Sequence, residues 1–125
     1  MQVFIVDDSA LVRQRLAELL VAVEHVHVIG EAGTVADALS RIPELRPDLV
    51  TVDIRMPDGD GVSVLKAIKQ LDRPPLVGVL TMFPTEPSRR RCYALGADFF
   101  WDKSKDLTAM TDVMRRLTQA EHTES

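Results

Sequence analysis

Five short apolar runs, rich in β-branched residues, alternate along the chain with longer segments of helical periodicity. The runs occupy residues 3–6, 27–30, 49–52, 76–80 and 99–101. Within the runs apolar residues follow one another, which is typical of strands that helices cover on both faces. Strands that alternate with helices form βαβ units with parallel pairing. The pattern therefore predicts an α/β fold, a single doubly wound (βα)5 domain with a five-stranded parallel sheet.

Signals for helices follow the apolar runs. Ser9, Thr34 and Asp60 stand directly before amphipathic segments, where N-cap residues are preferred. Residues 58–61 are expected to form a turn followed by the Asp60 cap. A further helix is expected over residues 86–95, with Pro87 near its start and Gly96 at its end, where helices prefer these residues. The last helix is expected over residues 107–117, where apolar residues recur at helical spacing. No linker, internal repeat or low-complexity segment interrupts this pattern. We therefore expect one domain and not two.

The composition is that of an ordinary globular domain. The 125 residues suffice for one domain, which we assign to residues 1–120, followed by a polar C-terminal tail at residues 121–125. A net charge of −4 argues against nucleic-acid binding by this chain. The single cysteine, Cys92, excludes an intrachain disulfide and a cysteine-rich metal site. Because no signal peptide or membrane-spanning stretch is recognisable, we expect a cytoplasmic protein without membrane contact.

Polar residues follow four of the five predicted strands. Asp7 and Asp8 come after the first, Asp53 after the third, Thr81 at the end of the fourth and Lys103 after the fifth. Ligands of open α/β sheets bind beyond the carboxyl ends of the strands. We therefore expect these five side chains to converge on one rim of the sheet.

Clustered carboxylates of this kind predict a divalent cation and phosphoryl chemistry. The oxygens of three aspartates suit Mg²⁺, which also accepts phosphate oxygens as ligands. Asp53 could then attack a phosphoryl donor and form an acyl phosphate, while Lys103 and Thr81 contact the phosphoryl oxygens. Each residue alone has a plainer reading as a helix cap, a turn former or a solvated charge. Their joint occurrence at successive strand ends favours the chemical interpretation.

With these residues in place, the chain resembles the response-regulator receiver family of two-component signalling, in its chemotaxis-regulator-like form. The resemblance runs from about residue 2 to residue 117, nearly the whole chain. The matching motifs, in chain order, are Asp7-Asp8, Asp53, Met56-Pro57, Gly61, Thr81, Gly96-Ala97-Asp98 and Lys103. The resemblance implies a flavodoxin-like sheet with the strand order 2-1-3-4-5.

The resemblance also implies a metal site and a phospho-acceptor. By position, Asp53 is the acceptor and takes its phosphoryl group from a histidine kinase or phosphotransfer protein. Asp8 would bind Mg²⁺ directly and Asp7 mainly through water. The backbone carbonyl of Arg55 would be a further ligand.

A conformational switch is implied as well. Thr81 would bind a phosphoryl oxygen in the active state, Lys103 would pair with the phosphoryl group, and Phe100 stands where the family has its switch aromatic. The surface of the fourth helix, fifth strand and fifth helix would then bind a downstream protein. Phosphorylation-dependent dimerisation through the fourth and fifth helices is common in the family, although no residue here requires it.

Three residues depart from the usual pattern of the family. Ser104 follows the lysine where proline is frequent. Met82 follows Thr81 where a small residue is usual, and Phe83 stands where many members have a polar residue. Together with Arg55, Phe83 is expected to tune the lifetime of the acyl phosphate.

Other functions remain open on the sequence alone. A phosphatase with an aspartyl-phosphate intermediate commonly needs a second acid two residues past the nucleophile, where this chain has Arg55. We therefore expect no enzyme beyond self-catalysed phosphorylation and dephosphorylation. A receiver fragment of a larger DNA-binding response regulator and a phosphorylation-independent pseudo-receiver that only binds partners are the alternatives.

Overall fold

The computed structural model describes residues 1–56 and 58–123. Pro57 of the Met56-Pro57 motif and residues 124–125 of the expected tail lie outside the described residues. The strands are β1 (Gln2–Val6), β2 (His27–Ala32), β3 (Leu49–Val52), β4 (Arg55–Met56), β5 (Gly59–Asp60), β6 (Leu76–Thr81) and β7 (Phe99–Asp102). The helices are α1 (Ala10–Val21), α2 (Val35–Leu45), α3 (Gly61–Lys69), α4 (Glu86–Ala94) and α5 (Leu107–Thr123).

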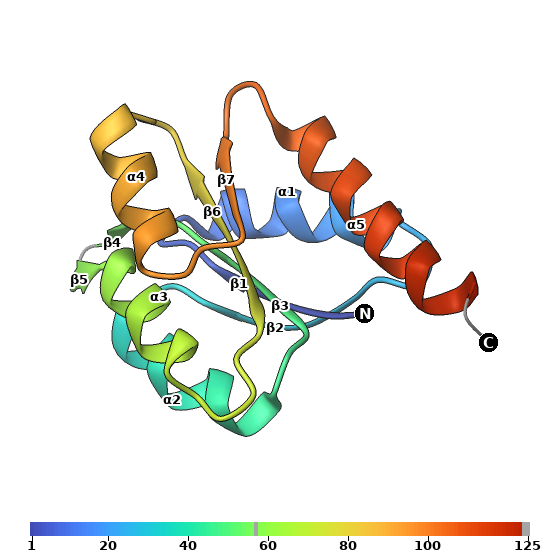
Figure 1. Cartoon of the computed structure of the whole chain (residues 1–125), viewed down its shortest axis with the longest axis horizontal. Helices are drawn as coiled ribbons and strands as arrows, with labels where there is room; N and C mark the ends of the chain where they lie inside the picture. The colour runs from blue at the N-terminus through green and yellow to red at the C-terminus, as the bar shows by residue number, and fades with distance from the viewer. Residues whose placement is uncertain (57, 124–125) are drawn as a thin grey trace.

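One parallel sheet organises the molecule (Figure 1). Its strands lie in the order β2-β1-β3-β6-β7, and all four neighbouring pairs are parallel. Because β4 and β5 form a separate antiparallel pair, the five sheet strands counted along the chain have the order 2-1-3-4-5. The predicted doubly wound fold and strand order are therefore confirmed.

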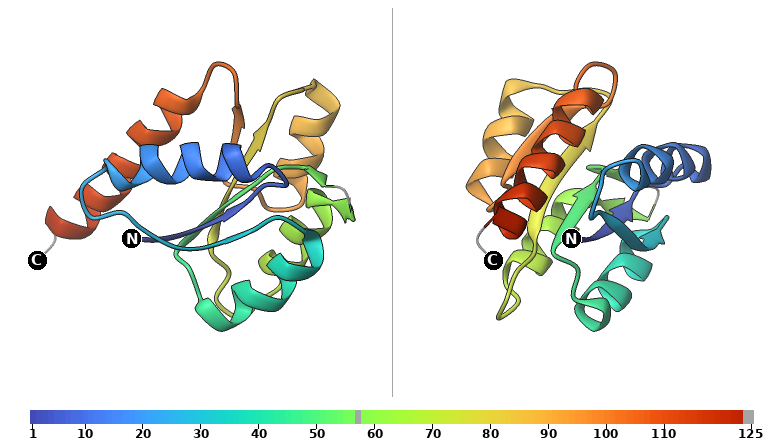
Figure 2. Two further views of the ribbon diagram at one scale, coloured as in Figure 1. Left: turned by 180° about the vertical axis from the view of Figure 1, so that it is seen from behind. Right: turned by 90° about the vertical axis from the view of Figure 1, so that its right-hand side faces the viewer.

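Helices cover both faces of the sheet, so each strand buries side chains on two sides (Figure 2). Along β1, Val3 and Ile5 pack with α1 and α5, whereas Phe4 and Val6 pack with α2, α3 and α4. Alternate residues of a strand point to opposite faces, so a strand covered twice must be apolar throughout. Burial of each large side chain such as Phe4 stabilises the fold by about 2–3 kcal/mol.

Helices α1, α2 and α3 begin at the predicted caps. The side chains of Ser9, Thr34 and Asp60 accept hydrogen bonds from the backbone N–H groups of the first helical turns at 2.9–3.2 Å. Thr85 does the same for α4, where the sequence analysis had identified only Pro87. These caps satisfy N–H groups that the helices themselves leave unpaired.

Some boundaries differ from the prediction. β2 runs two residues further than expected, to Ala32, whose carbonyl accepts the Asp7 N–H at 3.0 Å. Gly59 and Asp60, which were expected to belong to a turn, form β5 and pair with β4. α5 continues to Thr123, into the segment assigned to the tail, and the domain boundary at residue 120 stays a prediction. None of the helices within the described residues is long and apolar enough to cross a membrane.

Candidate metal and phosphoryl site

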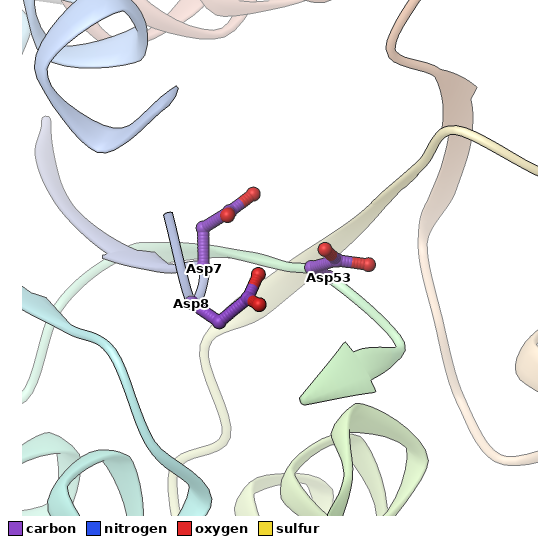
Figure 3. A group of neighbouring side chains, drawn as sticks. All are labelled: Asp7, Asp8 and Asp53. Atoms are coloured by element: carbon purple, nitrogen blue, oxygen red, sulfur yellow. The ribbon is translucent and has the colours of Figure 1, made fainter. Parts of the chain in front are cut away.

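Three carboxylates gather at the carboxyl ends of β1 and β3 (Figure 3). The two strands pair with Val6 opposite Val52, and the Asp53 N–H donates to the Val6 carbonyl at 3.0 Å. This register places Asp7 and Asp53 side by side directly after their strands. One carboxylate oxygen from each of Asp7, Asp8 and Asp53 lies within 4.8 Å of the others. Asp7 and Asp53 are buried, whereas Asp8 is exposed.

Lys103 connects two of these carboxylates. Its Nζ donates to Asp53 Oδ2 at 2.9 Å and also to Asp7 Oδ2, and its side chain is only 9% exposed. Burial alone would lower the pKa of Lys103, but the hydrogen bonds and charges of Asp7 and Asp53 outweigh it and raise the pKa above its ordinary value. The ammonium group therefore stays charged and offsets part of the negative charge of the cluster.

Thr81 lies at the end of β6, fully buried. Its carbonyl accepts the Lys103 N–H at 2.9 Å, which joins the ends of β6 and β7. Its Oγ1 accepts the Phe83 N–H at 3.2 Å, and no acceptor for its own hydroxyl hydrogen is found in the described part of the chain. The structure thus puts the predicted hydroxyl on the same rim as Lys103.

Arg55 contributes its backbone to the site. Its N–H donates to Asp53 Oδ1 at 3.0 Å, so both oxygens of Asp53 are held, one by this N–H and the other by Lys103. The Arg55 guanidinium lies 4.4 Å from the centroid of the exposed Phe83 ring. A cation–π pair therefore joins the segments that follow β3 and β6.

Phe100, the predicted switch aromatic, stands apart from the carboxylates. It lies on β7, partly buried on the face that α4 covers. Its ring is 6.5 Å from that of Tyr93, at 44°. A hollow of about 300 Å³ beside it is lined by residues of α4, β7 and the two loops that precede α4 and α5.

Hydrogen bonds shape the loop after Lys103, where serine replaces the frequent proline. The Ser104 N–H and Oγ both donate to Asp102 Oδ1, at 2.8 and 2.6 Å. The Asp102 N–H donates to Asp106 Oδ2 at 2.9 Å. The hydrogen bonds from Ser104 hold the pKa of Asp102 below its ordinary value. Hydrogen bonds among Asp102, Ser104 and Asp106 thus hold the loop that carries Lys103.

Two residues of the site's surroundings were missed by the sequence analysis. The Asp58 carboxylate accepts the N–H groups of Val35 at 2.9 Å and Ala36 at 3.2 Å, which ties the β4–β5 segment to the start of α2. Arg13 donates from Nη1 to the Asp7 carbonyl at 2.6 Å. The sequence analysis predicted only a turn at Asp58. For Arg13, the available signal was a charged residue at helical spacing from the buried Leu16 and Leu20 of α1.

Comparison with known proteins agrees with this geometry. The family model described as the response regulator receiver domain matches residues 3–115. The chain belongs to the response-regulator receiver family.

Among curated relatives of this receiver domain is protein-glutamate methylesterase/protein-glutamine glutaminase 1 of Methanospirillum hungatei, 35% identical over 90% of this chain and 33% of the relative. Another is the DNA-binding transcriptional activator DevR/DosR of Mycobacterium tuberculosis, 46% identical over 52% of this chain and 30% of the relative. The chain thus spans about a third of the length of these proteins.

A solved structure adds a similar fold. A chain of the CheX-CheY-BeF3-Mg complex from Borrelia burgdorferi superposes with a TM-score of 0.79 and 28% identity, over 91% of this chain and 89% of that chain. The receiver domain described here is therefore similar to that chain in both fold and sequence.

Proposed function

We propose that this receiver domain accepts a phosphoryl group on Asp53 from a histidine kinase or a phosphotransfer protein. One observation carries the proposal: the Asp53 carboxylate lies beside Asp7 and Asp8 while Lys103 bridges it to Asp7. Unlike Asp8, which is exposed, Asp53 is buried and held at both oxygens. A nucleophile so oriented needs little reorganisation before it attacks.

The donor set fits Mg²⁺. Three carboxylates offer hard oxygen atoms within 4.8 Å of one another, and the negative charge that they share exceeds what Lys103 offsets. Asp7, Asp8 and Asp53 would hold the ion, with the Arg55 carbonyl as a further ligand. When bound, Mg²⁺ neutralises charge on the phosphoryl oxygens. The similar chain from Borrelia burgdorferi belongs to a complex that contains Mg and BeF3, which supports this assignment.

The residues of the chain divide the chemistry among them. An oxygen of Asp53 forms a bond to phosphorus, the bond between phosphorus and the donor's leaving group breaks, and the leaving group keeps the electron pair. The product is an acyl phosphate. Lys103 moves its hydrogen bonds from the carboxylate to a phosphoryl oxygen. Thr81 donates its hydroxyl hydrogen to another.

The same residues support a protein-binding switch. Thr81 and Lys103 are fastened to each other at the ends of β6 and β7, and Phe100 lies on β7 three residues before the lysine. When Thr81 moves toward the phosphoryl group, Phe100 gains room to turn inward. The surface of α4, β7 and α5 then changes, which shifts the population toward a form that a downstream protein prefers.

The activity of the chain is confined to its own phosphorylation and dephosphorylation. In the relatives that carry a methylesterase or DNA-binding name, the matched segment covers only 33% and 30% of the length, so a function in a longer regulator is a second proposal. A phosphatase is less well supported, because Arg55 stands where such an enzyme needs its second acid and binds Phe83 instead.

Intact-mass spectrometry tests the proposal. The protein is incubated with a small acyl phosphate and Mg²⁺, beside Asp53→Asn, a chelated sample and Asp72→Asn, which changes an exposed aspartate far from the cluster. We expect one phosphoryl group on the wild type and on Asp72→Asn, and none on the other two samples. A wild type that never gains mass, even with kinase domains present, would instead support a pseudo-receiver.

A further inference from the structure

Arg13 fastens three segments of the chain beside the acidic cluster. From the second turn of α1, its Nη1 donates to the Asp7 carbonyl at 2.6 Å. Its Nε donates to Glu31 Oε1, near the end of β2, at 3.0 Å. A Cβ added to Gly33 would lie 2.9 Å from Nη1, so the guanidinium rests against the backbone of the β2–α2 loop. With 19% of its side chain exposed, Arg13 is held in place.

The bond to the Asp7 carbonyl fixes a peptide plane that matters for the cluster. The peptide between Asp7 and Asp8 is planar, so holding its carbonyl oxygen also fixes the orientation of the Asp8 Cα. The other ends of Asp7 are held too: its N–H by Ala32 and its carboxylate by Lys103 and the Ser9 N–H. Arg13 thus holds the Asp7–Asp8 peptide and the Ser9 N–H bond holds the Asp8–Ser9 peptide, so the direction in which Asp8 leaves the chain depends on both.

The Asp8 carboxylate itself has little to orient it. It is exposed, and no hydrogen bond or ion pair of its carboxylate is found among residues 1–56 and 58–123, yet an oxygen of this carboxylate lies within 4.8 Å of oxygens of Asp7 and Asp53. A side chain without partners of its own takes its direction from its backbone. The position of the third carboxylate thus depends on its two flanking peptides, one of which Arg13 holds from outside the cluster.

We propose that Arg13 is a positioning residue that sets the affinity of the acidic cluster for a divalent cation. The inference rests on the proposed function, since it concerns the same Mg²⁺ site. Arg13 touches neither the ion nor the phosphoryl group; it acts through the Asp7–Asp8 peptide. Groups that orient metal ligands in this way change metal affinity by about 10–100-fold.

The direction in which Mg²⁺ affinity changes when Arg13 is replaced distinguishes a positioning role from an effect of its charge alone. A guanidinium near the site repels Mg²⁺, so a residue that acted only by its charge would weaken binding, and its removal would tighten it. Positioning predicts the opposite, weaker binding after removal. Arg13→Lys sharpens the contrast, because lysine keeps the charge but lacks the planar fork that reaches Asp7 and Glu31 together.

Calorimetric titration with MgCl₂ gives the test. For Arg13→Ala we expect affinity lower by about tenfold, and for Arg13→Lys a loss of similar size. Glu31→Gln, which removes the half-exposed ion pair but leaves the Asp7 carbonyl bond, should stay within about twofold of the wild type. An Arg13→Ala protein that binds Mg²⁺ as tightly as the wild type, or more tightly, overturns the proposal.

Further measurements keep the outcome clear. Urea unfolding in chelator reports stability without metal, and a variant that loses stability but keeps its Mg²⁺ affinity shows a purely structural role and contradicts the proposal. Should Arg13→Ala not fold, Gly33→Ala crowds the guanidinium by a single methyl group and should weaken Mg²⁺ binding severalfold; unchanged binding again contradicts it. A wild type that binds no Mg²⁺ removes the metal site itself, and with it both proposals.

Discussion

The ammonium group of Lys103 lies 2.9 Å from the Asp53 carboxylate, although 50 positions separate the two residues in the chain. Lys103 and Asp53 belong to loops after β7 and β3, which meet only because the sheet brings their carboxyl ends to one rim. Together with Asp7, which Lys103 also contacts, they form a nearly buried group of two negative charges and one positive charge.

Replacing Lys103 with alanine should destabilise the metal-free protein by about 3 kcal/mol, because it leaves two buried carboxylates without their cation. Added Mg²⁺ should restore much of this loss, since the ion supplies positive charge to the same oxygens and binds only the folded chain. Urea unfolding with and without Mg²⁺ measures both effects. An equal loss of stability with and without Mg²⁺ would mean that Lys103 and the ion do not act on the same carboxylates.

Gly61→Ala should disturb the acceptor directly. A Cβ at residue 61 would lie 1.9 Å from the Asp53 carbonyl oxygen, so the backbone itself must move. We expect a loss of about 3 kcal/mol in the free energy of unfolding and slower phosphoryl uptake. Gly59→Ala is the matched control, because among residues 1–56 and 58–123 its added Cβ meets only the Val35 side chain, at 3.4 Å. Equal stability of the two variants would refute this explanation of Gly61.

The bond between Asp58 and the start of α2 predicts a pH dependence. The hydrogen bond from the Val35 N–H has the largest effect on Asp58 and lowers the pKa of its carboxyl group. The folded state therefore favours the charged carboxylate. Its contribution to stability is present above the unfolded pKa, near 4, and is lost as the pH falls through the lower folded value. The stability difference between wild type and Asp58→Asn should therefore shrink from pH 5 to about pH 2.5. A difference that stays constant over this range would contradict the assignment.

The Arg55–Phe83 pair should govern the lifetime of the acyl phosphate. Phe83→Glu replaces an apolar ring beside the site with a carboxylate that can orient water, so we expect decay to accelerate by about tenfold. A double-mutant cycle of Arg55→Ala and Phe83→Leu, measured on the free energy of unfolding, should give a coupling energy of about 0.5–1 kcal/mol. An unchanged decay rate in Phe83→Glu would remove Phe83 from this role.

Much of the fold could be predicted because its signals are local. The apolar runs mark strands buried on both faces, and the caps Ser9, Thr34 and Asp60 mark helix starts. The predicted residues at the strand ends also lie where expected, since parallel strands end on one rim. Their chemical roles, however, stay predictions.

The contacts that the sequence did not reveal join segments far apart in the chain. Strands of two residues, such as β4 and β5, are too short for any periodicity. The bond from Val35 to Asp58 spans 23 positions, and the bond from Arg13 to Glu31 spans 18. The residues next to each of these positions do not predict its partner, because the partner depends on how the sheet places the loops.

Mapping the phosphorylated residue tests the proposed function most directly. After incubation with a small acyl phosphate and Mg²⁺, borohydride reduces the acyl phosphate of a phosphorylated aspartate to the alcohol of homoserine and releases phosphate, and peptide mass spectrometry then locates the homoserine. We predict homoserine at position 53 alone, and none when Mg²⁺ is chelated. Homoserine at position 7 or 8, or an unmodified Asp53 in a protein that has gained mass, would contradict the assignment of Asp53 as the acceptor.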